Sequence, residues 1–248
     1  MECDFMELFP IIVTFFSFGG LLLGGIVGLA TKRIIEKQTY RLYALCGGIL
    51  LGLLLLDIIP ETFSSYEITG PLLGITIGIL MMCLIDHSCH RFVIHYNDQQ
   101  TWQTFLFLSF AIFIHNLPSG FALGTAFTTH HESTLSFLLA IIIHHVPEGL
   151  ALIISFLFTE HKYISFILII LFLSIILGLS TAFGMIINSK TIHLPGLIMG
   201  SAIGSLGYVT IHEMLWKAKK HLSLFSFLSW IFVGCLLIIV FIPFISHH

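Results

Sequence analysis

Long apolar stretches separated by short polar segments run along this whole sequence. A helix needs about 20 mostly apolar residues to cross a bilayer, and eight stretches meet that length. They cover residues 8–31, 42–61, 68–87, 102–127, 134–159, 163–188, 193–216 and 223–245. Because the connections are short, we predict an all-α polytopic membrane protein in which residues 1–248 form a single transmembrane domain, an eight-helix bundle.

The composition supports membrane embedding. Of the 248 residues, 57% are hydrophobic and only 9% are charged, whereas a soluble domain usually carries about 25% charged residues. So few charges cannot cover a surface that faces water. No basic run indicates nucleic-acid binding, and the five cysteines are too scattered for a disulfide framework.

Lysine and arginine fall almost entirely on one side of the predicted bundle. Nine of the ten lie between helices 1 and 2, 3 and 4, 5 and 6, or 7 and 8, and only Lys190 lies in a connection on the other side. Since cytoplasmic loops carry the excess of these residues, both termini are predicted to be extracytoplasmic. The short loops and small size favour a multi-pass protein of a bacterial plasma (inner) membrane.

Two segments of the sequence resemble each other. Residues 115–123 read HNLPSGFAL and residues 144–152 read HHVPEGLAL, and they share five of nine positions. The two segments lie near the middle of consecutive antiparallel helices, so we expect them to meet at the bilayer midplane, as transport sites built from repeats do. Pro118 and Pro147 each leave one backbone carbonyl without its helical partner, and a cation or water can satisfy it.

These two segments concentrate metal-ligating side chains. The residues are His115, Asn116, Ser119, His144, His145 and Glu148. His144 and Glu148 are four residues apart and therefore share a helix face. Imidazole and carboxylate suit divalent first-row metals, and three imidazoles with one carboxylate suit tetrahedral zinc. The alternative is a packing role with a protonated Glu148, which a cluster of four such groups inside a membrane disfavours.

The motifs HNLPSG at 115–120 and HHVPEG at 144–149 resemble the signature motifs of the ZIP family (Zrt-, Irt-like proteins). The resemblance implies eight helices with both termini outside, and a main metal site at His115, His144, His145 and Glu148 with Asn116 at its edge. It also implies that helices 1, 4, 5 and 6 move against helices 2, 3, 7 and 8. Ser119 departs from the bacterial pattern, which has glutamate there, so one nitrogen-rich site is expected rather than two metals.

Further polar residues are candidates for an exit site. The resemblance places exit-side ligands at His212 and Glu213, near the inner end of helix 7. Asp86, His87 and His90 follow helix 3 and are predicted to receive metal with them. The alternative for this histidine-containing loop is a solvated surface segment.

Two carboxylates, Asp57 and Glu61, lie near the predicted outer end of helix 2. They are candidates for an entrance that raises the local concentration of cations. A solvated helix end is the alternative.

The predicted function is transport of a divalent transition metal into the cytoplasm by alternating access. Zinc is the expected substrate, with cadmium, iron and manganese as further candidates, and no resident cofactor or enzyme activity is expected. One alternative is an intramembrane zinc-dependent hydrolase with Glu148 as general base, although the pattern HExxH is absent. A haem-binding electron carrier with axial histidines is another. The expected partners are the metal ion, the lipid bilayer and, by the resemblance, a second copy of the chain.

Overall fold

The computed structural model is a bundle of long helices, and it describes residues 2–93, 100–129, 134–157, 159–186 and 194–246. Within these ranges there is no β-strand. The helices, in chain order, are α1 (Glu2–Ala30), α2 (Lys32–Leu53), α3 (Ile59–Ser65), α4 (Thr69–Val93), α5 (Gln100–Thr129), α6 (Thr134–Phe156), α7 (Tyr163–Ile186), α8 (Leu194–Tyr208), α9 (Trp216–His221) and α10 (Leu224–Ser246).

Two π-helical segments join neighbouring helices into longer rods. Leu54–Ile58 links α2 to α3, and Val209–Leu215 links α8 to α9. The rods are longer than the predicted helices 42–61 and 193–216, because they continue through polar residues that an apolar-run criterion leaves out. π-Helical turns occur frequently at functional sites, and these two contain Asp57, His212 and Glu213.

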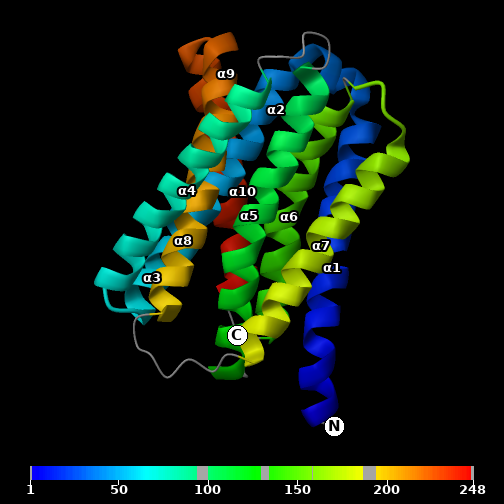
Figure 1. Ribbon diagram of the computed structural model, residues 1–248. Coiled ribbons are helices and arrows are strands. Elements are labelled where there is room, and N and C mark those ends of the chain that lie inside the picture. The colour runs from blue at the N-terminus through cyan, green and yellow to red at the C-terminus, as the bar shows by residue number, and fades with distance from the viewer. Residues whose placement is uncertain (1, 94–99, 130–133, 158, 187–193, 247–248) are drawn as a thin grey trace.

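Over the part of the chain that the structure describes, eight helical rods traverse the bundle, in agreement with the predicted number. Six of the described helical stretches are long and apolar enough to cross a membrane, and the shorter apolar stretches Ile143–Phe156 and Leu224–Val240 belong to α6 and α10. Figure 1 shows both termini at the same end of the molecule, as an even number of crossings requires. The protein is therefore a helical membrane protein.

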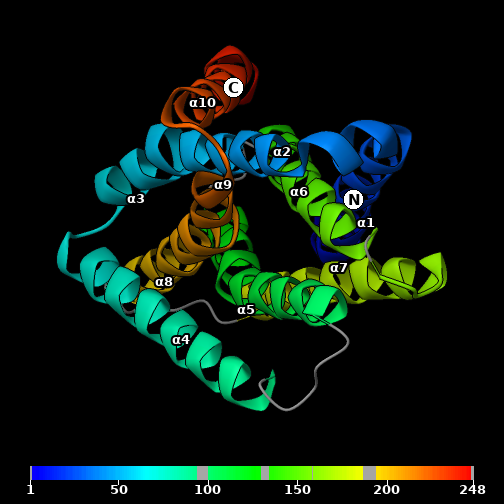
Figure 2. The same cartoon turned by 90° about the horizontal axis from the view of Figure 1, so that it is seen from above.

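The helices divide into two halves by their contacts. In one half α1 packs on α6 and α7, and α5 packs on α7. In the other half α4 packs on α8, while α10 packs on the outer side of α2 (Figure 2). The halves meet where α5 contacts α8 and where α2 contacts α6. The predicted helices 1, 4, 5 and 6 are α1, α5, α6 and α7, which form the first half. The two halves therefore coincide with the two groups of helices that the family resemblance implies.

Glycines bring the helix backbones together inside each half. A methyl group on Gly24 of α1 would collide with the backbone oxygen of Val146 in α6, and one on Gly204 of α8 would collide with that of Ile75 in α4. Small residues at helix contacts allow close packing of membrane helices. These glycines thus tighten pairs of helices within a half.

Candidate metal centre

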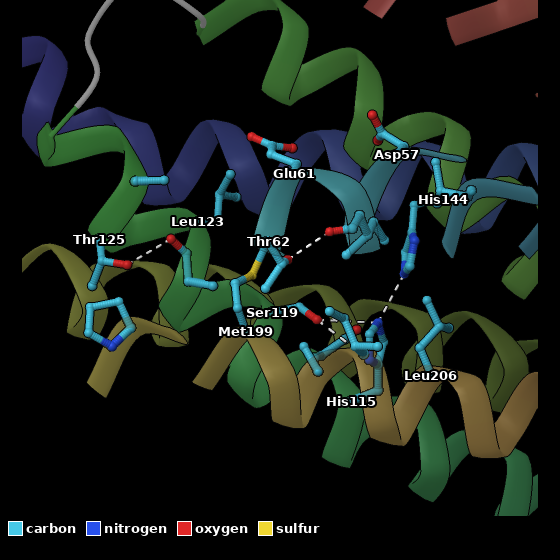
Figure 3. Close-up of a pocket in the computed structure, with 18 of the residues that line it drawn as sticks. Asp57, Glu61, Thr62, His115, Ser119, Leu123, Thr125, His144, Met199 and Leu206 are labelled. Carbon is cyan, nitrogen blue, oxygen red and sulfur yellow. Dashed lines mark hydrogen bonds between the residues drawn. The ribbon is translucent and has the colours of Figure 1, made fainter. Parts of the chain in front are cut away.

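A cavity of about 610 Å³ leads into the boundary between the two halves. Its lining includes exposed Glu61 and half-buried Asp57 from the rod of α2 and α3, and buried His115 from α5. Figure 3 shows His115 and His144 pointing toward one another, with Asp57 and Glu61 among the other residues that line the pocket. The cavity also touches Pro195 at the start of α8, so it opens toward the end that holds both termini.

The two repeated segments converge at the inner part of this cavity. His115 Nε2 lies 3.0 Å from His144 Nε2, and His144 Nε2 lies 3.2 Å from Glu148 Oε1. One ligand atom from each of the three residues lies within 4.8 Å of the other two. We call His115, His144 and Glu148 the buried cluster, because the side chains of His144 and Glu148 are only 13% and 2% exposed and His115 is 3% exposed.

Ser205 of α8 fixes the orientation of His115 from the opposite half. Ser205 Oγ donates to the carbonyl of Ala202 at 3.0 Å and lies 3.3 Å from His115 Nδ1. A hydroxyl has only one hydrogen, so Ser205 Oγ accepts from Nδ1–H. The Nε2 lone pair of His115 is then left facing His144, and a neutral imidazole with a free Nε2 is the form that binds metals.

The remaining predicted ligands surround the buried cluster. His145 Nε2 is 3.9 Å from Glu148 Oε2, on the far oxygen of that carboxylate. Ser119 Oγ is 3.3 Å from His115 Nε2. Asn116 donates its amide to the carbonyl of Leu173 at 3.3 Å, while its fully buried Oδ1 has no hydrogen-bond partner among the described residues.

The two helices that carry the repeated segments remain continuous at their prolines. α5 runs through Pro118 and α6 runs through Pro147. Pro118 lies three residues after His115, and Pro147 lies three residues after His144. Neither proline can donate to the carbonyl one turn earlier. Each proline therefore removes one helical hydrogen bond beside an imidazole without breaking the helix.

A second cluster joins α4 to the rod of α8 and α9. Asp86, His212 and Glu213 place one ligand atom each within 4.8 Å of one another. His212 Nδ1 is 3.2 Å from Glu213 Oε1 and 3.8 Å from Asp86 Oδ2. Tyr208 donates its hydroxyl to Asp86 Oδ2 at 2.7 Å, and Lys217 Nζ donates to Glu213 Oε2 at 2.6 Å. We call Asp86, His212 and Glu213 the distal cluster.

The two clusters lie at different heights along the rod of α8 and α9. Ser205 touches the buried cluster, and His212 follows seven residues later, a rise of roughly 10 Å along a helix. The buried side chains of Val209 and Thr210 lie between them in sequence. The distal cluster is therefore on the side of the buried cluster opposite to the cavity mouth.

The other predicted site residues have mixed placements. Asp57 and Glu61 line the cavity. His87 lies beside Asp86 on α4 but its side chain is exposed and it is not among the three residues of the distal cluster. The side chain of His90 and the loop residue Lys190 lie outside the described residues. Sequence reasoning missed Ser205 and Tyr208, whose partners are set by helix packing. It also missed Lys217, although its four-residue spacing from Glu213 on one helix could have indicated the pair.

Comparison with known proteins gives one match. A family model described as ZIP Zinc transporter matches residues 94–242, which is more than half of the chain. The matched region contains both repeated segments as well as His212 and Glu213. No curated protein matches the chain.

Proposed function

Because the chain belongs to the ZIP zinc transporter family, a family of divalent metal transporters, we propose that it carries zinc into the cytoplasm through the buried cluster. Two imidazole nitrogens and one carboxylate oxygen within 4.8 Å are the single observation that carries this proposal. Such a donor set suits tetrahedral zinc with an open fourth position. Cadmium, iron and manganese are weaker candidates by the same ligand preference.

The burial of Glu148 supports a cation at this site. An ionised carboxylate inside a membrane-embedded bundle costs several kcal/mol unless it is paired. Glu148 contacts His144 and His145, and neutral imidazoles do not cancel its charge. A divalent cation would do so, and protons would take its place in the empty state. His145 and Asn116 complete or flank the site, with Ser119 as a weaker ligand.

The two clusters suggest an order of events. Metal would enter through the cavity past Asp57 and Glu61, bind at the buried cluster, and leave through the distal cluster. With the termini extracytoplasmic, the present conformation is open to the outside. The reverse state requires the half formed by α1, α5, α6 and α7 to shift against the other, since the cavity here is lined by His115 and His144 but by no residue of the distal cluster. We propose that this occurs in a homodimer in the plasma membrane.

A transport assay tests the proposal directly. The purified protein is reconstituted in liposomes loaded with a zinc-sensitive dye, and zinc uptake is measured for wild type, His115→Ala and Glu148→Ala. Saturable uptake by wild type and loss of at least about 100-fold in both variants is expected, because each removes a ligand. Glu160→Ala and His161→Ala are matched controls, since both residues are exposed and lie between α6 and α7.

Two results would count against the proposal. Uptake that survives both ligand substitutions would show that the metal passes elsewhere. No uptake above empty liposomes, with zinc retained in a fixed ratio after purification, would favour the hydrolase alternative, because a transporter must exchange its metal.

A further inference from the structure

A lysine occupies one side of the distal cluster. Lys217 Nζ lies 2.6 Å from Glu213 Oε2, one helical turn along the rod. The Glu213 side chain is 6% exposed and the Lys217 side chain 36% exposed, so the ion pair is partly shielded from water. A partly buried pair of opposite charges is screened less than a surface pair.

The two oxygens of Glu213 have different partners. Oε1 faces His212 Nδ1 at 3.2 Å, on the side where Asp86 completes the cluster. Oε2 accepts from Lys217. An ammonium is a compact point charge that engages a single oxygen, whereas a guanidinium tends to take both. The lysine thus leaves Oε1 available for a metal while it neutralises much of the carboxylate charge.

The buried cluster lacks a comparable cation. Among the described residues, Glu148 pairs only with His144 and His145. The distal cluster instead has two carboxylates and one imidazole, and Lys217 offsets one of its two negative charges. Nearby positive charge disfavours binding of another cation, so the distal cluster should hold metal less tightly with the lysine than without it.

We propose that Lys217 is a built-in counter-cation that weakens divalent metal binding at the distal cluster and so speeds metal release. The inference rests on the proposed transport function, and it names the residue that sets the release step. When metal leaves, the flexible side chain of Lys217 again satisfies Glu213, so the emptied carboxylate is not left unpaired. Without the lysine, the two carboxylates and His212 would retain the metal and delay turnover.

Zinc binding to the distal cluster tests this role. Zinc chloride is titrated by calorimetry into detergent-purified Glu148→Ala protein, in which the buried cluster is disabled, with and without Lys217→Met. We expect Lys217→Met to tighten zinc binding roughly tenfold, because it removes the charge, and Lys217→Arg not to tighten it, because the guanidinium keeps the charge and tends to take both oxygens of Glu213. Lys219→Met is the matched control, since Lys219 is exposed, on the same helix, and over the ring of Trp216.

Turnover provides the second measurement. In liposomes, Lys217→Met on the wild-type background should lower kcat and KM together, because release slows while binding strengthens, and Lys219→Met should change neither. Equal zinc affinity with and without Lys217, or no zinc binding at all in the Glu148→Ala protein, would overturn the inference. Either result would leave wild-type uptake intact, whereas failure of the transport proposal would appear as absent wild-type uptake.

Discussion

In the buried cluster the carboxylate of Glu148 faces only histidines among the described residues, whereas in the distal cluster Glu213 faces a histidine and a lysine. The histidines differ in exposure as well, since the side chain of His144 is 13% exposed and that of His212 is 42% exposed. Similar ligands in such different surroundings should bind metal with different strength.

The difference matches what transport requires of two successive sites. A site that selects the ion gains from burial, because low dielectric strengthens each interaction with the metal. A site that releases the ion gains from water and from a competing cation. The comparison therefore predicts that damage to the buried cluster abolishes binding, while damage to the distal cluster mainly slows turnover.

Exchange of each carboxylate for an amide gives the largest contrast. Glu148→Gln should lower zinc uptake by at least ~100-fold and abolish high-affinity zinc binding, because it removes the anionic ligand of the buried cluster. Glu213→Gln should lower kcat roughly tenfold and leave high-affinity zinc binding within about threefold of wild type. Dye-loaded liposomes and calorimetry measure the two quantities. Equal loss of binding in both variants would contradict the assignment of different roles.

Much of the buried cluster could be predicted from the sequence, because its members obey helix geometry. His144 and Glu148 share a face at four-residue spacing, and the repeated segment places His115 on the neighbouring antiparallel helix. The structure brings these three together. His145, the fourth predicted ligand, lies 3.9 Å from the other oxygen of Glu148, since adjacent residues point in directions about 100° apart on a helix.

Other features have no signature in the sequence. The π-helical segments at Leu54–Ile58 and Val209–Leu215 depend on packing, and no residue pattern marks them. The predicted second helix ends at Glu61, because polar residues follow the apolar run. In the structure the helix continues through polar residues that follow Glu61, and some of them line the cavity. Contacts such as Ser205 with His115 join residues 90 positions apart in the sequence, so only the three-dimensional arrangement reveals them.

The contact between Ser205 and His115 provides an intermediate effect. Ser205→Ala should weaken zinc binding at the buried cluster roughly tenfold, because His115 loses the acceptor that holds Nδ1–H and directs Nε2 at the metal. Ser201→Ala is the matched control, since Ser201 donates to the carbonyl of Ile198 one turn earlier on α8. Calorimetry with zinc chloride compares the two variants.

Thermal stability, measured beside zinc affinity, separates loss of orientation from simple packing damage. If Ser205 selects the tautomer of His115, Ser205→Ala should weaken zinc binding while its detergent-solubilised melting temperature stays close to that of Ser201→Ala. A melting temperature that falls together with affinity would instead indicate a structural role for Ser205.

The smallest expected effect is at the cavity mouth. Glu61 lines the same cavity as the buried imidazoles, but its own side chain is exposed. Glu61→Gln should raise KM for zinc about two- to threefold at low ionic strength and leave kcat unchanged, because an exposed carboxylate acts by concentrating cations rather than by binding them. The effect should vanish near ~0.5 M salt, where the Debye length is only about 4 Å.

Glu67→Gln is the control for this measurement, because Glu67 is also exposed and close in sequence but does not line the cavity. Uptake is measured over a range of zinc concentrations at two ionic strengths. A fall in kcat, or an effect that persists at high salt, would place Glu61 in direct contact with the metal. In that case the contrast between a selective buried site and an electrostatic approach to it would be wrong, and the cavity mouth would be a third binding site.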